Sequence, residues 1–321
     1  AGPSDAGPTD AGPCDAGSMD AGSPTDAGPA DTGVMCTPAT ETCNGRDDDC
    51  DGLVDESACG THLLITEVVV TPTAGEFVEV HNPTSAAVSL TNVYLADTSE
   101  YACRLAGVTC APTVSGAIST TDFVARFPAG TALMPGQYVT VAMADPAVFR
   151  TTYGRCPDYY LRGSADAMCP MSQLMLSAGA TGTNTIGTGT SLTDGGEPVV
   201  LFSWDQTAPR VVDLDYVVYG SPSTSNPRID KTSLMSTVSG MTATYLADTP
   251  SAMQATLTAH TSGRSNVRCD FSEGSERRTG GNGAMGHDET SENWAVTWRS
   301  SPTPGDAGPA SVTPGAENNC R

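Results

Sequence analysis

The apolar residues of this chain recur in short runs with the twofold period of β-strands. Residues 62–70 (HLLITEVVV) form the first strong run, which is rich in β-branched side chains. Residues 76–83 (EFVEVHNP) alternate apolar and polar side chains as a half-buried strand does, and residues 89–95 (SLTNVYL) form a third run. Because segments containing Gly, Pro or Asn separate these runs, the pattern predicts an all-β protein.

Residues 1–33 lack any such pattern. They repeat Asp-Ala-Gly-Pro-x, with aspartates at five-residue steps from Asp5 to Asp20. Because this composition cannot bury enough apolar surface to fold, we expect a disordered, extended acidic tail there. The sequence therefore predicts a spacer (1–33), an acidic disulfide-bonded loop (34–60) and one β domain (61–321).

Residues 43–56 (CNGRDDDCDGLVDE) are strongly acidic. Alternate aspartates before Gly52 follow D-x-D-x-D-G, the first half of a calcium loop. An EF-hand would place a glutamate six residues after that glycine, where this chain has Ala58, so we expect no EF-hand. The expected cation is Ca²⁺, because carboxylates without a histidine disfavour zinc and copper. The predicted metal ligands are Asn44, Asp47, Asp49, Asp51, Asp55 and Glu56.

The spacing in this loop resembles the calcium loops of thrombospondin type 3 repeats. The whole string, cysteines included, resembles a short acidic metal-binding motif of secreted myxobacterial-type proteins. The alternative is a solvated acidic loop without metal, which is what most charge runs are. Gly52 and the flanking cysteines favour metal binding over that alternative.

The composition restricts the partners and the compartment. A formal net charge of −22 and a single lysine, Lys231, argue against nucleic acid, because a phosphate-binding surface needs clustered Lys and Arg. Abundant Gly, Pro, Ser and Thr are typical of an exported, loop-rich β protein, and no apolar run is long enough to predict a transmembrane segment. The start at Ala1, inside a repeat, suggests a processed N-terminus and leaves a lipoprotein-type tether open.

Eleven cysteines predict an oxidising compartment, so we expect the chain to be secreted or displayed on the outer cell surface. Cysteines close in sequence are expected to pair, which leaves Cys14 in the tail without a partner. The expected pairs are Cys36–Cys59, Cys43–Cys50, Cys103–Cys110, Cys156–Cys169 and Cys269–Cys320.

Several segments, in the right order, resemble lamin tail domains. Residues 62–95 resemble the opening signature I-x-E-V…E-F-V-E-L-x-N-P, and residues 127–142 (FPAGTALMPGQYVTVA) resemble the F-P-x-G-T-x-L-x-P-G-x-Y hairpin of that family. The later matches are residues 194–202, 211–220, 272–281 and 292–305. The resemblance implies an immunoglobulin-like β-sandwich, in agreement with the short strands and Gly/Pro turns.

The chain also departs from the family. It carries long insertions at about residues 98–122, 155–190 and 225–270, and Tyr94 stands where the family usually has an anchoring Trp. Short disulfide rings within the insertions would lower the entropy cost of ordering them. A short helix is expected over residues 251–257 (SAMQATL).

Catalytic signals are weak. The sequence has no G-x-S-x-G, P-loop or dinucleotide-binding motif, and its four histidines show no H-x-x-x-H or H-x-H spacing. Glu67, Glu76 and Glu79 could supply the carboxylate pair of a glycosidase. We expect them instead to pair with strand neighbours or with Arg277 and Arg278. No catalytic residue is therefore predicted.

Residues 286–293 (GHDETSEN) place His287 among three acidic residues. We expect an exposed acidic loop there, and a second metal site is the alternative.

Together these features predict a non-enzymatic structural or adhesive protein whose loop is stabilised by calcium. Its partner would be an extracellular matrix polymer, a surface protein or another copy of the chain. Two alternatives remain: an accessory binding module of an exported hydrolase system, and a metal-scavenging protein. Fold resemblance by itself identifies no ligand.

Overall fold

The computed structural model describes residues 37–40, 48–50, 62–114, 116–189, 192–223, 227–271, 275–300, 312–318 and 320. All of them lie in one compact unit, Gly33–Arg321. These residues form mostly strands in several sheets, so the all-β prediction is confirmed. The predicted spacer, residues 1–33, lies outside the described residues.

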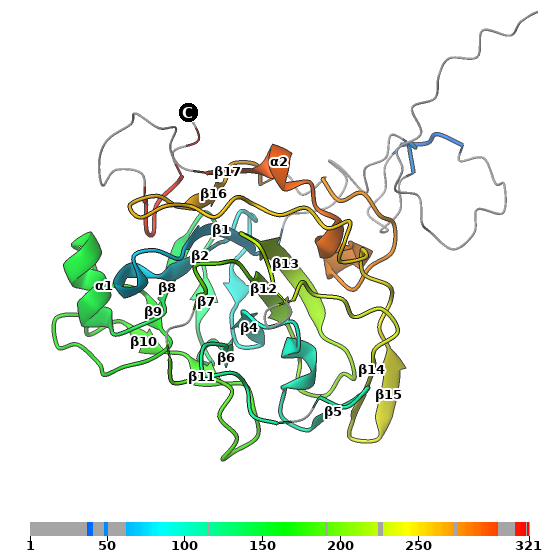
Figure 1. Ribbon diagram of the computed structural model, residues 1–321, viewed down its shortest axis with the longest axis horizontal. Helices are drawn as coiled ribbons and strands as arrows, with labels where there is room; N and C mark the ends of the chain where they lie inside the picture. The colour runs from blue at the N-terminus through cyan, green and yellow to red at the C-terminus, as the bar shows by residue number, and fades with distance from the viewer. Residues whose placement is uncertain are drawn as a thin grey trace, which may run out of the picture. The chain divides into compact units, whose positions relative to one another are not determined.

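The first sheet has seven strands in the order β10-β9-β8-β2-β1-β16-β17 (Figure 1). β1 pairs antiparallel with β2 and β16, and β2 pairs antiparallel with β8. A bulge between Ile65 and Glu67 shifts the register of β1 against β2. The strands are β1 (Leu64–Val69), β2 (Phe77–His81), β8 (Tyr138–Ala142), β9 (Tyr159–Tyr160), β10 (Gln173–Leu174), β16 (Asn266–Arg268) and β17 (Trp298–Ser300).

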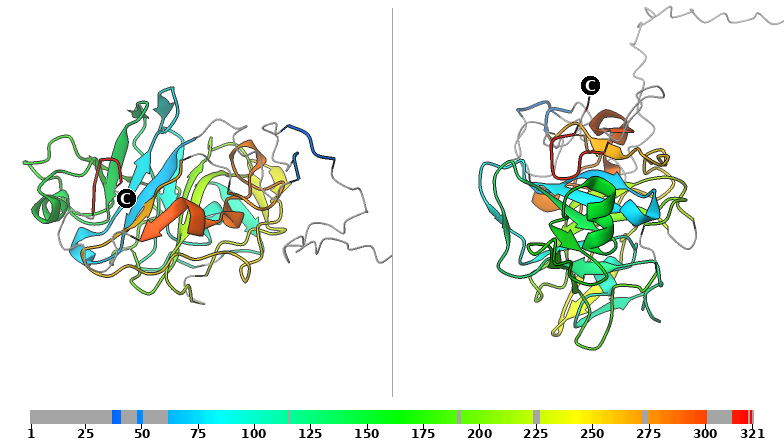
Figure 2. Two further views of the ribbon diagram at one scale, coloured as in Figure 1. Left: turned by 90° about the horizontal axis from the view of Figure 1, so that it is seen from above. Right: turned by 90° about the vertical axis from the view of Figure 1, so that its left-hand side faces the viewer.

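The second sheet has five strands in the order β11-β6-β4-β12-β13, all paired antiparallel. It faces the first sheet, and β13 contacts β1 (Figures 1 and 2). Its strands are β4 (Val93–Ala96), β6 (Val124–Arg126), β11 (Leu176–Ser177), β12 (Pro198–Ser203) and β13 (Val212–Val218). This arrangement is the predicted immunoglobulin-like β-sandwich.

The main hydrophobic core fills the space between the two sheets. Ile65 and Val80 contribute from the first sheet, and Leu95 and Phe202 contribute from the second; all are fully buried. Tyr94, at the position where the family usually has Trp, stacks on Phe202 with ring centroids 5.1 Å apart. The smaller aromatic ring is therefore accommodated within the core.

The outer face of the first sheet is also covered, so the expectation of a half-buried strand at residues 76–83 is wrong. Helix α1 (Pro146–Tyr153) packs Phe149 against Phe77 of β2. Residues 312–318, the C-terminal strap, lie over β1 and β2: the Nδ2 of Asn318 donates to the carbonyl of Thr66 at 2.8 Å. Burial therefore extends to the polar side chains of these two strands.

Two of the insertions meet in a separate three-stranded sheet, β15-β14-β5. β5 (Val108–Ala111) comes from the first insertion, and β14 (Met235–Val238) and β15 (Met241–Thr244) come from the third. Three disulfides are formed as predicted: Cys103–Cys110, Cys156–Cys169 and Cys269–Cys320.

Two local predictions are wrong. Residues 251–257 form a turn and an isolated bridge from Leu257 to Tyr219, not a helix. The segment 127–142 is not a hairpin, because β7 (Ala132–Leu133) pairs with β3 (Val88–Ser89) whereas β8 pairs with β2. The remaining elements are η1 (Thr73–Gly75), η2 (Tyr101–Cys103), η3 (Ala284–Gly286), η4 (Glu289–Ser291) and α2 (Trp294–Thr297).

Among the described residues, no helix combines the length and the apolar character needed to cross a membrane.

Candidate metal centre and buried ionic network

The predicted calcium loop lies almost entirely outside the described residues. Of its six predicted ligands only Asp49 is described; Asn44, Asp47, Asp51, Asp55 and Glu56 are not. The carbonyl of Asp48 accepts a hydrogen bond from the backbone N–H of Ala39 at 2.8 Å. Cys50 is disulfide-bonded, and its predicted partner, Cys43, is not described. Calcium binding at this loop therefore stays a prediction.

A buried guanidinium joins both sheets to the C-terminal region. Arg268 of β16 binds Asp215 of β13 at 2.6 Å and Glu292 at 2.8 Å, and all three side chains are buried. Its Nε donates to the carbonyl of Ile65 at the β1 bulge, 3.1 Å away. The indole N–H of Trp294 donates to Glu292 at 2.7 Å. Because Arg268 binds both carboxylates, it holds β16, β13 and the segment around Glu292 in one arrangement. Removing any one of these three side chains would leave a buried charge without its partner.

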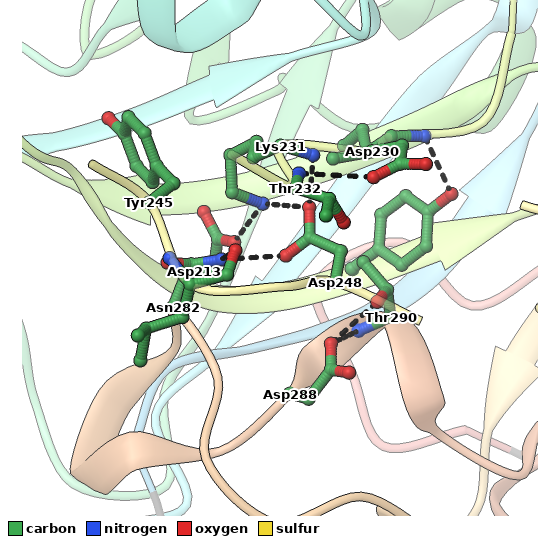
Figure 3. Close-up of polar contacts among 12 residues, drawn as sticks. Asp213, Asp230, Lys231, Thr232, Tyr245, Asp248, Asn282, Asp288 and Thr290 are labelled. Carbon is green, nitrogen blue, oxygen red and sulfur yellow. Dashed lines mark hydrogen bonds and ion pairs between the residues drawn. The ribbon is translucent and has the colours of Figure 1, made fainter. Parts of the chain in front are cut away.

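The only lysine of the chain forms a second buried cluster (Figure 3). Nζ of Lys231 lies 2.8 Å from Asp213 of β13 and 2.9 Å from Asp248. Burial opposes the charge on this amine, but Asp213, Tyr101 and Asp248 raise its pKa well above the ordinary value. Asn282 donates to the other oxygen of Asp248 at 2.7 Å. The cluster therefore anchors the third insertion and the segment around Asn282 to the sandwich.

A third cluster combines an imidazole with two carboxylates. Glu276, His287 and Glu289 each offer one donor atom, and these atoms all lie within 4.8 Å of one another. All three side chains are at most 2% exposed. Oε2 of Glu276 lies 3.6 Å from Nδ1 of His287, which is longer than a hydrogen bond. The expectation of an exposed acidic loop at residues 286–293 is therefore wrong.

His62 lies two residues before β1. Burial lowers the pKa of its imidazole to about 4, and the charges of Glu276 and His287 also act on it. Its Nδ1 is hydrogen-bonded to the carbonyl of Leu63 at 3.2 Å.

Two glycines shape the loop that carries the cluster. A Cβ on Gly281 would lie 2.1 Å from the carbonyl oxygen of His287, and a Cβ on Gly283 would lie 2.6 Å from Oε1 of Glu289. The backbone N–H of Gly283 also donates to the carbonyl of His287 at 2.9 Å. Gly281 and Gly283 help to line a pocket of about 380 Å³, together with Arg210, Val211 and Leu246. Gly283 thus lines this pocket and also lies against a carboxylate of the cluster.

The glutamates that could serve a glycosidase are committed to structural contacts. Glu67 of β1 and Glu79 of β2 are register partners, and both are fully buried. The backbone N–H of Thr313 in the C-terminal strap donates to Glu67 at 3.2 Å, and the hydroxyl of Thr66 donates to Glu79 at 2.8 Å. The expectation of strand-neighbour contacts is thus confirmed for Glu79.

The alternative expectation, that Arg277 and Arg278 pair with these glutamates, is wrong for Arg278. Its guanidinium donates to the carbonyl of Asp248 at 2.6 Å and lies 3.6 Å from Asp288.

Sequence reasoning missed both ionic clusters around Arg268 and Lys231. Their members are far apart along the chain: 53 residues separate Arg268 from Asp215. No local sequence signal marks either cluster.

A family model described as the Lamin Tail Domain matches residues 56–248. This range is more than half of the chain, and the chain therefore belongs to the lamin tail domain family. The two closing segments that resemble the family, residues 272–281 and 292–305, lie beyond the matched range.

No curated protein matches the chain. Among solved structures, the chain is similar to the crystal structure of a DUF4876 family protein from Bacteroides thetaiotaomicron VPI-5482. The two share 12% identity over 75% of this chain and 71% of that chain, with a TM-score of 0.42. A likeness at this level supports no conclusion about function.

Proposed function

We propose that the protein is an exported, non-enzymatic binding protein of structural or adhesive type. Its lamin tail sandwich is the binding head, and a calcium-stabilised loop at residues 43–56 precedes that head in the sequence. The three disulfides favour an oxidising, extracellular environment.

One observation carries the non-enzymatic part of the proposal: the carboxylates best suited to catalysis are enclosed. Glu67 and Glu79 lie on adjacent strands beneath the C-terminal strap, whose backbone N–H groups at Thr313 and Gly315 donate to them. A glycosidase needs its carboxyl groups on either side of an accessible glycosidic bond. Carboxylates that a strap covers and hydrogen-bonds serve to position that strap.

The calcium part of the proposal rests on the acidic sequence. Six carboxylates within ten residues, 47–56, repel one another unless a cation neutralises them. A divalent ion with oxygen ligands would hold the loop closed and fix the approach of the chain to β1. The binding surface for a matrix polymer, a surface protein or a second copy would then be presented in a fixed orientation.

The calcium proposal is tested by thermal unfolding of the disulfide-intact protein in excess Ca²⁺ and in EGTA. A site that binds only the folded state stabilises by about 2.7 kcal/mol when free Ca²⁺ is a hundredfold above Kd. The expected shift in Tm disappears in the double variant Asp49→Asn/Asp51→Asn. An equal Tm in calcium and EGTA would refute the proposal.

The binding proposal is tested by light scattering and by co-sedimentation with extracellular polysaccharide, each with and without Ca²⁺. Association with the polysaccharide, with surface protein or with other copies is expected. Turnover of a polysaccharide or ester substrate by the purified chain would instead identify an enzyme.

A further inference from the structure

We propose that Glu276, His287 and Glu289 form a binding site for one divalent transition-metal ion of the zinc type. This site is distinct from the calcium loop at residues 43–56, and it stands whether or not that loop binds calcium.

The spacing of the donor atoms fits a single small cation. Two ligands that bind one tetrahedral zinc at about 2.0–2.2 Å lie about 3.4 Å apart. Oε2 of Glu276 and Nδ1 of His287 lie 3.6 Å apart, and a carboxylate oxygen of Glu289 completes a group within 4.8 Å. The Glu276–His287 pair is therefore within a few tenths of an ångström of the tetrahedral separation, and closing the whole group would change donor separations by at most about 1.4 Å.

The oxygen that would bind the metal is otherwise unsatisfied. Glu276 is 1% exposed, and its Oε2 accepts no hydrogen bond from the described residues. Buried carboxylate oxygens are normally hydrogen-bonded or coordinated, since an uncompensated one is costly. Arg268, whose charge also acts on Glu276, binds Asp215 and Glu292. A dication would further offset the negative charges of Glu276 and Glu289.

The donor set indicates which metal class binds. Calcium and magnesium take oxygen ligands, whereas an imidazole together with carboxylates suits zinc and neighbouring transition metals.

The backbone around the site is closely fitted to it. Gly283 lines the pocket of about 380 Å³, and any larger residue there would crowd the carboxylate of Glu289. The hydrogen bond from Gly283 to the carbonyl of His287 fixes the backbone beside the imidazole. The simpler alternative is a buried histidine–glutamate ion pair without metal. That alternative predicts no retained metal and no specific spectrum.

The test uses the full chain, stripped of metal with dipicolinate and EGTA and then loaded with Zn²⁺ or Co²⁺. We expect the wild type, after dialysis in buffer without chelator, to retain one zinc per chain, measured by mass spectrometry of the elements. The cobalt form should show the intense visible bands of a tetrahedral site with nitrogen coordination, and added Zn²⁺ should abolish them. Because this part needs no variant, it stays decisive if a substitution prevents folding.

Variants then assign the ligands. His287→Gln, Glu276→Gln and Glu289→Gln should each weaken zinc binding at least about tenfold, as loss of a ligand or its support does in other sites. Asp49→Asn/Asp51→Asn and the exposed Glu317→Gln should retain zinc, so failure of the calcium loop would not be mistaken for failure of this site. Three results would overturn the proposal: no zinc on the wild type, undiminished zinc on His287→Gln, or zinc lost with Asp49 and Asp51.

Discussion

Replacing Glu67 with glutamine should change how the stability of the protein depends on pH. Glu67 faces Glu79 across β1 and β2, and both carboxyls are fully buried. Burial, with the charge of Glu79 as the next cause, raises the pKa of Glu67 from its ordinary 4.5 to about 8. Burial also raises the pKa of Glu79, to about 7.

The sign and the magnitude follow from these values. Between pH 4.5 and about 8, folded Glu67 keeps a proton that the unfolded chain has already released. The free energy of unfolding therefore falls as pH rises, by about 1.4 kcal/mol per pH unit for this group. Over the whole interval the loss amounts to about 5 kcal/mol. The stabilising contribution is complete below pH 4.5 and is lost above pH 8.

Glutamine resembles the protonated acid and does not ionise. We expect Glu67→Gln to match the wild type within about 1 kcal/mol at pH 5 and to exceed its stability by several kcal/mol at pH 9. The measurement is urea unfolding at pH 5, 7 and 9, followed by the fluorescence of the three buried tryptophans, with disulfides intact and free thiol blocked.

The matched control is Glu317→Gln, which removes an exposed carboxylate from the C-terminal strap. Its stability should run parallel to that of the wild type at every pH. If the free energy of unfolding of Glu67→Gln had the same pH dependence as that of the wild type, the buried carboxyl would not be protonated in the folded state. That result would refute the reasoning.

Three further changes test other parts of the structure. Lys231→Met should lower the free energy of unfolding by about 3–5 kcal/mol, because it leaves two buried carboxylates without their cation; a loss below about 1 kcal/mol in urea unfolding would contradict this. Replacing both Cys269 and Cys320 with serine removes a disulfide that closes a loop of 51 residues, and it should lower the free energy of unfolding by about 4 kcal/mol. An unchanged urea midpoint would refute this expectation. Gly220→Ala should destabilise by at least about 1 kcal/mol more than Gly240→Ala. Both glycines have positive φ, but only at Gly220 would the new Cβ meet backbone, 2.5 Å from the carbonyl oxygen of Gly195. Equal Tm values for the two alanine variants would show that this contact is unimportant.

The strands of the sandwich could be predicted because their signal is local. β-branched residues with a twofold period mark β1 and β2 directly, and a neighbouring cysteine pair such as Cys103–Cys110 needs only a short loop to close. What covers the outer face could not be predicted in this way. The C-terminal strap reaches Glu67 from 246 residues away, so the burial of that polar face depends on a contact that no local pattern records.

The helices were mispredicted in two ways: α1 was not predicted, and the helix predicted over residues 251–257 does not form. Helix α1 has local signals that were available: Pro146 at its first position and Gly154, in the left-handed conformation with φ 71°, after its last. Residues 251–257 have helix-compatible composition, but Leu257 instead donates its N–H to Val218 of β13. There a tertiary backbone contact outweighs a weak propensity.

The candidate transition-metal cluster likewise could not be predicted from local signals, because tertiary contacts create it. The segment GHDETSEN has the composition of a solvated loop, and its burial follows from packing of η4 against β13 and from close backbone contact at Gly281. Neither contact is visible in the spacing of His287 and Glu289. The sequence could name His287 and Glu289 as candidates, whereas the approach of Glu276 to them required the fold.

The Cys269–Cys320 disulfide also determines how the domain would bear a mechanical load. Cys269 directly follows β16, which lies between β1 and β17 within the seven-stranded sheet. A pulling force applied beyond Cys320 would pass through the disulfide to this interior strand and bypass the intervening 270–319 segment. Because β16 is hydrogen-bonded on both sides, its extraction requires the two ladders to shear together, whereas an edge strand can peel away one bond at a time. The covalent link would thus carry tension to an interior strand of the sheet.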